Sequence, residues 1–292
     1  ALSDQATSQS APPPIADITQ IEREPNVVVI GKRRNLLTIP GSGAAIDGED
    51  LEKSRPLTIN DALRQAPGVF PRDEEGLGLR PNIGIRGLNP TRSTKVLLLE
   101  DGIPLAFAPY GDNATYFHPS FKRYERIEVL KGASQVRFGP QTIGGVINYI
   151  TPKAPDEFGG RALASFGSQG LFELDATAGG PLLGGRGLLH AQTKRTDSSR
   201  ENQDLQFSDV FAKMEWDIAD DQALTLRVSR YKEDSQVTYS GLTLAEFQAN
   251  PYGNAFANDE FDLERIGGAA GHAWFLGDET SVKTTLYGSH FT

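Results

Sequence analysis

Residues 126–152 read RIEVLKGASQVRFGPQTIGGVINYITP, and this stretch decides the fold of the first half of the chain. Two short segments rich in β-branched and apolar residues, at 126–130 and 146–151, have the length and composition of strands. The segment between them contains Gly139-Pro140 and Gly144-Gly145, which are residues that mark tight turns. We therefore predict two strands joined by a constrained loop.

The residues that precede this stretch extend it into a compact α+β domain over residues 45–153. Further short strands are expected at 83–86 and 96–100, where apolar residues are bounded by glycine, proline and charged residues. Two helix starts come before them, because small polar residues stand where an N-cap is needed. Asp47 can cap a turn at 49–53, and Thr58 or Asn60 can cap a helix at about 61–65 that Pro67-Gly68 ends.

From about residue 159 the pattern changes to long strands in which apolar and polar residues alternate. In FSDVFAKMEWDI (207–218), Val210, Met214 and Trp216 point to one face, whereas Asp209 and Lys213 point to the other. Seven such strands are expected, at 160–167, 171–179, 186–196, 206–218, 222–233, 262–276 and 280–292.

The connections between these strands alternate between short turns and the long polar segments 196–206 and 233–261. Short turns on one rim and long loops on the other are typical of outer-membrane barrels. Trp216 and Trp274-Phe275 lie beside the short turns, as an aromatic girdle would. A soluble β-sandwich explains the alternation alone but not the unequal connections. Seven strands leave an open sheet edge in lipid, so we expect an incomplete barrel.

Composition excludes several classes of protein. The 292 residues include no cysteine, which excludes disulfides, thiolate metal sites and cysteine nucleophiles. The net charge of -9 argues against a nucleic-acid partner, because phosphate binding requires clustered Lys and Arg. No run approaches the ~20 apolar residues of a membrane-spanning helix.

Several motifs in one order resemble those of the TonB-dependent outer-membrane receptors: TINDALRQAPGV (58–69), IRGLNP (85–90), VLLLEDGIPL (96–105) and the opening stretch. DGIPLAFAPYG (101–111) is most similar to the ferric citrate receptor group. The resemblance implies an α+β plug domain followed by antiparallel transmembrane β-barrel strands, the first part of a 22-stranded barrel. The expected boundaries are a flexible tail at 1–25, the plug at 26–155 and about seven barrel strands at 156–292.

The resemblance also implies a location and a function, namely active uptake of a ferric chelate, most closely ferric dicitrate, across a Gram-negative outer membrane. Iron would be cargo, with no resident cofactor or metal site. The expected partners are outer-membrane lipid and TonB, with ExbB and ExbD as its energy supply. The run Val27, Val28, Val29 and Ile30 is similar to a TonB box, a segment that pairs with a strand of TonB.

Two sets of site residues are expected on the plug. The outward loops 71–81, 89–94, 106–113 and 136–141 would offer donors to an anionic chelate, from Arg80, Arg92, Asn113 and Gln141. A charge network holding the plug to itself and to the barrel would use Arg86, Glu128, Lys131 and Arg137. Asp73, Glu74 and Glu75 depart from this pattern, because carboxylates in the first outward loop would repel ferric citrate.

Other functions remain open at this level. The same architecture could carry another siderophore or cobalamin, and a secreted β-rich binding or adhesion protein is a further alternative. An enzyme is not expected, because the sequence has no nucleophile–base pair or metal constellation. His118, His190, His272 and His290 are scattered without metal-ligand spacing and are interpreted as structural.

Overall fold

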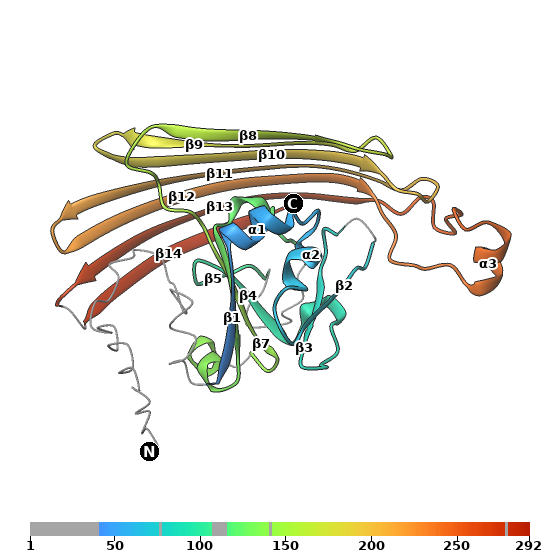
Figure 1. The fold of residues 1–292 in the computed structure, drawn as a ribbon, viewed down its shortest axis with the longest axis horizontal. Coiled ribbons are helices and arrows are strands. Elements are labelled where there is room, and N and C mark those ends of the chain that lie inside the picture. The colour runs from blue at the N-terminus through green and yellow to red at the C-terminus, as the bar shows by residue number, and fades with distance from the viewer. Residues whose placement is uncertain (1–40, 76–77, 107–115, 140–141, 278–279) are drawn as a thin grey trace, which may run out of the picture.

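The computed structural model describes residues 41–75, 78–106, 116–139, 142–277 and 280–292, without the side chains of Ser134, Val136 and Arg137. These residues form a small mixed unit and a large curved sheet that lies over it (Figure 1). The small unit corresponds to the domain expected around residues 45–153, and the sheet contains the long alternating strands.

A five-stranded sheet with the order β1-β6-β7-β4-β5 forms the centre of the small unit. Only β4 and β7 pair in parallel; the other described neighbours in this sheet are antiparallel. Every residue of β7 is buried, and Asn148 alone interrupts its apolar sequence. The strands are β1 Ser42–Asp47, β4 Val96–Glu100, β5 Ile103–Pro104, β6 Arg126–Lys131 and β7 Gly145–Ile150.

Two short helices pack beside this sheet, and each begins with a capping box. In α1 (Gly48–Ser54), the N-cap Asp47 donates its backbone N–H to Asp50 Oδ2 (3.2 Å). In α2 (Ile59–Leu63), the N-cap is Thr58, whose hydroxyl accepts from the backbone of Asp61 (3.3 Å). The alternative cap, Asn60, lies inside the helix and is fully buried.

Smaller elements complete the unit. A two-stranded sheet joins β2 and β3, and three 3₁₀ helices follow in the connections. The predicted constrained loop between β6 and β7 contains the last of these helices. The bounds are β2 Val69–Arg72, β3 Asn82–Ile85, η2 Thr91–Ser93, η3 Phe121–Arg123 and η4 Ala133–Phe138.

The large sheet has seven strands in sequence order, each antiparallel to the next. Their ends lie within about three residues of the predicted ranges, because the period-two pattern follows the pleat directly. The strands are β8 Gly159–Phe166, β9 Phe172–Leu182, β10 Gly185–Asp197, β11 Asp204–Ala219, β12 Gln222–Gln236, β13 Phe261–Phe275 and β14 Ser281–Phe291.

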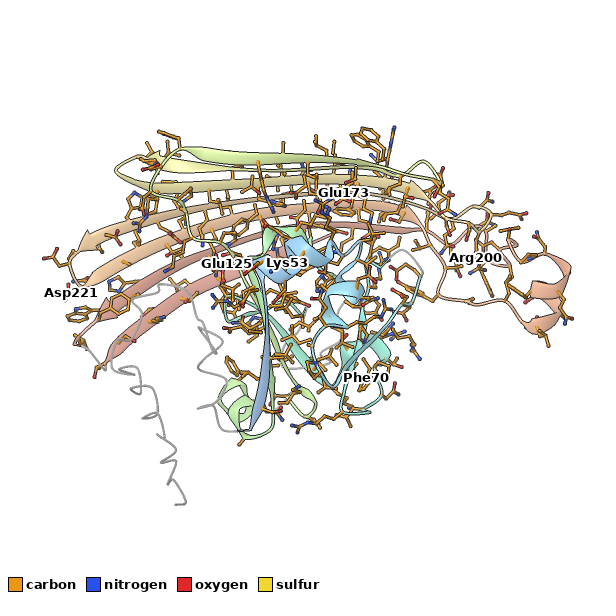
Figure 2. The ribbon with its side chains drawn as sticks, in the orientation of Figure 1. Lys53, Phe70, Glu125, Glu173, Arg200 and Asp221 are labelled. Carbon is orange, nitrogen blue, oxygen red and sulfur yellow. The ribbon has the colours of Figure 1, made fainter. Side chains whose placement is uncertain are left out.

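The two faces of this sheet are the reverse of those in a soluble domain. On the outer face Val210 is 43% exposed and Val228 is 53% exposed, whereas on the inner face Asp209 and Lys213 are 0% and 1% exposed. The small unit covers this charged inner face (Figure 2). Among the described residues no second sheet covers the apolar face. The β-sandwich alternative is therefore wrong.

The two ends of the sheet differ as predicted. Two-residue turns join β9 to β10 and β11 to β12, whereas residues 237–260, with α3 (Leu244–Ala249), extend from the opposite end (Figure 1). Trp216 and Trp274 lie by the short turns, where their indole N–H groups donate to Leu183 O (3.1 Å) and Asp221 Oδ2 (2.9 Å). None of the described helices has the length and apolar character needed to cross a membrane.

Candidate functional site at the plug–barrel interface

Arg123 makes the central contact between the small unit and the large sheet. Its Nη1 donates to both carboxylate oxygens of Asp209 on β11, at 2.9 and 3.1 Å. Its Nη2 pairs with Glu100 at the end of β4, and the backbone N–H of Ser120 also donates to Asp209 (2.9 Å). The side chains of Arg123 and Asp209 are almost fully buried. One guanidinium therefore joins the plug to itself and to the wall.

The electrostatics of this contact favour its charged form. Burial raises the pKa of Glu100, but Arg123 and Arg227 outweigh it and lower that pKa to about 2. Burial raises the pKa of the Tyr124 hydroxyl, which stays protonated and donates to Glu100 (2.8 Å). Tyr124 also stacks on Tyr149, with ring centroids 4.9 Å apart.

A second contact fixes the chain where it leaves the plug. Asp101 accepts from the backbone and hydroxyl of Thr151, at 2.9 and 2.7 Å, and pairs with Arg227 of β12. Lys213 of β11 donates to the Thr151 hydroxyl (3.2 Å) and lies 3.0 Å from Glu215. Residues 151–154 are thereby tied to two barrel strands.

A third contact lies towards the long loops. Arg80 pairs with Glu233 of β12, and both side chains are 2% exposed. The Arg80 guanidinium also lies over the Phe261 ring, 3.9 Å from its centre. Nearby, Gln203 donates to the backbone oxygen of Glu75 (2.8 Å).

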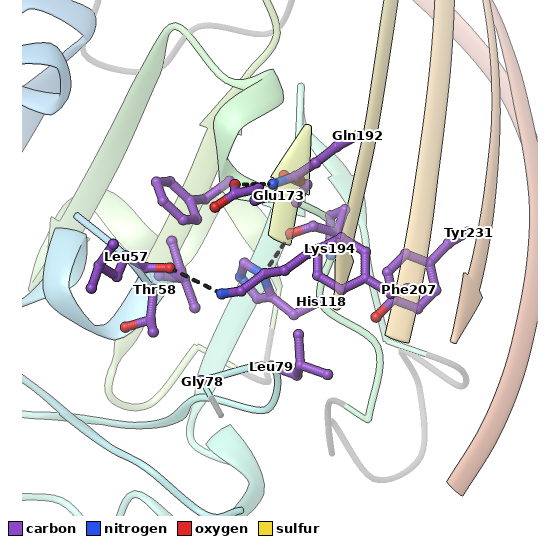
Figure 3. A pocket seen from close by; sticks show the side chains of 14 residues that line it. Leu57, Thr58, Gly78, Leu79, His118, Glu173, Gln192, Lys194, Phe207 and Tyr231 are labelled. Atoms are coloured by element: carbon purple, nitrogen blue, oxygen red, sulfur yellow. Dashed lines mark hydrogen bonds between the residues drawn. The ribbon is translucent and has the colours of Figure 1, made fainter. Parts of the chain in front are cut away.

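A cavity of about 30 Å³ lies between the plug and the inner wall (Figure 3). Polar side chains line it: Gln192 donates to Glu173 (2.5 Å) and Lys194 to Leu57 O (3.5 Å). A space of this size and polarity suits one or two water molecules and is far too small for a chelate. In the described part of the chain, His, Asp and Glu side chains form no group that could hold a metal ion.

The structure separates the residues predicted to bind ligand. Arg80 is buried against the barrel wall, so the prediction that it faces a ligand in the lumen is wrong: Glu233 and Phe261 occupy its surroundings. Arg92 is exposed, 5.4 Å from the Tyr116 ring, and stays a candidate. Asn113 and Gln141 lie outside the described residues.

Three residues of the predicted charge network make contacts within the plug. Arg86 donates to the Ser42 hydroxyl (2.9 Å), Glu128 lies 3.9 Å from Arg126, and Lys131 donates to Pro67 O. Burial lowers the pKa of Lys131, and the charge of Arg86 lowers it further. The described contacts of these three residues lie within the plug, and their link to the barrel stays a prediction.

Two further sequence predictions have no structural description. The side chain of Arg137 and the proposed TonB box Val27, Val28, Val29 and Ile30 lie outside the described residues.

His118 fits its structural interpretation, because its ring nitrogens lie 2.8 Å from the Tyr149 hydroxyl and 2.9 Å from Pro119 O. Burial lowers its pKa to about 4, so it is neutral at pH 7.

The interface residues that the sequence did not identify are Arg123, Asp101, Asp209 and Glu233. Their partners lie between 86 and 153 residues away along the chain, so local spacing carries no information about the pairing. Only the barrel strands carry a sequence pattern from which interface residues could have been predicted. A charge on the inner face of a strand with an apolar outer face predicts a partner inside the barrel.

Comparison with known proteins agrees with this architecture. Residues 35–146 match the model of the TonB-dependent receptor plug domain. Over 239 residues the chain is 26% identical to the vitamin B12 transporter BtuB of Photobacterium profundum, covering 79% of this chain and 37% of that protein.

Solved structures give the same result. The unliganded ferric citrate transporter FecA matches with a TM-score of 0.81 and 26% identity, over 91% of this chain and 42% of FecA. The siderophore receptor PirA from Acinetobacter baumannii matches with a TM-score of 0.61 and 24% identity, over 85% of this chain and 40% of PirA, which supports the fold alone. The chain thus spans about two fifths of the length of these relatives. It contains the plug domain of a TonB-dependent receptor, followed by strands that match the β-barrels of these Gram-negative outer-membrane proteins.

Proposed function

We propose that the chain is the plug and part of the wall of a TonB-dependent transporter that takes up a ferric chelate, with ferric dicitrate as its cargo. The observation that carries the proposal is the inside-out sheet, whose charged inner face is covered by the plug while its apolar face points outward. A sheet of this kind suits a lipid-embedded wall around a polar lumen. The proteins it resembles are named as transporters and receptors rather than enzymes.

Transport through such a lumen requires the plug to rearrange. We propose that Val27 to Ile30 supply the point of attachment for TonB, itself energised by ExbB and ExbD. A short β-branched run can add to a strand of a partner through its backbone donors and acceptors. Val28→Pro removes one donor, so energised uptake should be lost while ligand binding is kept. Uptake at the wild-type rate in this variant would place the attachment elsewhere.

The cargo is the finer part of the proposal. Ferric dicitrate is anionic, and the exposed Arg92 lies in an outward loop of the plug. Arginine binds carboxylates through two parallel hydrogen bonds, which suits a citrate ligand. The similarity to FecA, with a TM-score of 0.81, supports this choice.

Cobalamin is a second candidate, and a specific observation favours it. The relative that matches 239 residues of this chain is named as a vitamin B12 transporter. In addition, Asp73 and Glu74 lie in the first outward loop, where negative charge would oppose a citrate complex.

Equilibrium binding to the complete receptor distinguishes these cargoes. Ferric citrate, a ferric hydroxamate and cobalamin are each titrated against the wild type and the Arg92→Gln variant. We expect ferric citrate to bind most tightly and to lose at least tenfold in affinity in Arg92→Gln. Tightest binding of cobalamin, unaffected by this substitution, would replace the ferric citrate proposal with the second candidate.

A further inference from the structure

We propose that Arg80 is a latch that fixes the long extracellular loop, residues 237–260, to the plug. The term extracellular rests on the proposed function, because it assigns the long-loop end of the barrel to the cell exterior. The latch itself is a statement about contacts and mobility. It requires neither a ligand nor TonB.

Arg80 contacts both of the strand ends that this loop connects. The loop connects β12 to β13, and Glu233 lies near the last residue of β12 whereas Phe261 is the first residue of β13. Arg80 pairs with the former and stacks on the latter. Tyr231 completes the group by donating its hydroxyl to Glu233 (2.8 Å). One plug side chain therefore contacts two paired barrel strands at the root of their loop.

The loop is also tied by hydrogen bonds to the other described long loop of the barrel, residues 198–203. Arg200, in the loop between β10 and β11, donates to Ser240 O (2.9 Å) and Gly253 O (3.2 Å). The backbone of Glu201 donates to Tyr252 O (2.7 Å), and Asn254 donates to Glu201 O (3.0 Å). Hydrogen bonds thus join loops 198–203 and 237–260 to each other.

The latch leaves its guanidinium incompletely bonded. Nη2 of Arg80 is satisfied by Glu233, but Nε and Nη1 are buried and have no hydrogen-bond partner among the described residues. Buried donors without partners are unfavourable. A competing hydrogen-bond acceptor can therefore replace Glu233 as the partner of Arg80. A contact that is to be released needs this property.

Loop mobility tests the latch directly in the complete receptor, without ligand. This chain has no cysteine, so Phe247→Cys adds one site for a spin label on the exposed face of α3, with any cysteine in the rest of the receptor replaced by serine. Chymotrypsin cleavage at the exposed Tyr252 gives an independent rate. We expect Arg80→Gln to increase the cleavage rate at least tenfold and to narrow the spin-label spectrum. The matched control is Arg64→Gln, an exposed plug arginine, which should leave both readings within twofold.

Two further variants keep the proposal falsifiable if Arg80→Gln does not fold. Glu233→Gln should free the loop as well, and the exchanged pair Arg80→Glu with Glu233→Arg should restore slow cleavage. Wild-type cleavage and spectra in a folded Arg80→Gln or Glu233→Gln receptor would overturn the latch. Because neither measurement uses uptake, a failure of the transport proposal would leave this result readable.

Discussion

Replacing Arg123 by methionine should undock the plug from the barrel more strongly than any other single change at the interface. The substitution keeps an apolar stem of similar length but removes the guanidinium. Asp209 keeps only the Ser120 N–H donor and Glu100 keeps the Tyr124 hydroxyl, with the charge of Arg227 nearby. Two buried carboxylates thus lose their main partner together.

The magnitude follows from the burial of this pair. Breaking a buried ion pair by removing one partner costs about 3–5 kcal/mol, because the other charge stays desolvated. Since about 1.4 kcal/mol corresponds to a factor of ten, plug opening should become roughly a hundredfold to several thousandfold more frequent. Removing the charges together should cost less. A triple variant with Arg123→Met, Asp209→Asn and Glu100→Gln should recover part of the loss.

Amide hydrogen exchange in the complete receptor measures this opening. The informative amides are those of β6 and β7, which open only when the plug sheet does. Lys53→Met is the control, because Lys53 pairs with Glu49 on an exposed helix face and such pairs contribute little. If exchange in Arg123→Met changes less than about fivefold, or if the triple variant exchanges faster than the single one, our account of the interface is refuted.

Three further outcomes are expected. Because burial lowers the pKa of His118 to about 4, the unfolded chain binds a proton that the plug does not between pH 6.5 and 4. The free energy of unfolding should therefore decrease as the pH decreases from 6.5 to 4. His118→Gln should weaken this pH dependence, which urea unfolding at several pH values measures. Gly84→Ala would place a Cβ 2.4 Å from Leu88 O and should lower the free energy of unfolding by about 1–3 kcal/mol, whereas Gly159→Ala, with open space, should not. Burial raises the pKa of Glu75, so the folded receptor becomes less stable as the pH rises and this carboxyl group loses its proton. Glu75→Gln, which cannot ionise, should therefore stabilise the receptor at pH 7 but not at low pH.

The barrel strands were predictable because one physical rule fixes the face of the sheet on which each side chain lies. A strand side chain faces either lipid or lumen, so alternation alone located all seven described strands and their inner faces. The short helices were less certain. Thr58 and Asn60 are both residues that favour the N-cap position. Thr58 takes this position because Asn60 is buried and donates to Asp73, thirteen residues away. Local sequence cannot contain that information.

The interface was predicted in kind but not in detail. Family motifs drew attention to Arg86 and Glu128, which stabilise the plug itself in the described contacts. Arg123 stands in an ordinary basic run, and its partner Asp209 follows 86 residues later. Nothing in either segment identifies the other. Alternation showed that Asp209 faces inward, but only the folded plug shows which cation meets it.

The plug is held differently at its two ends, and this bears on how it could move. Towards the long loops, β11, β12 and β13 contribute Phe207, Tyr231 and Leu263 to the plug's own apolar core. Towards the short turns the contacts are mainly polar, from Lys213 and Glu215 to residues 151–154, and the apolar cluster there is small, Ala154 with Leu188 and Phe211. Water can replace a polar pair at little net free energy, whereas separating apolar surfaces costs about 25 cal/mol per Å². A pull from the short-turn side should therefore open the polar half first and leave the apolar half in place.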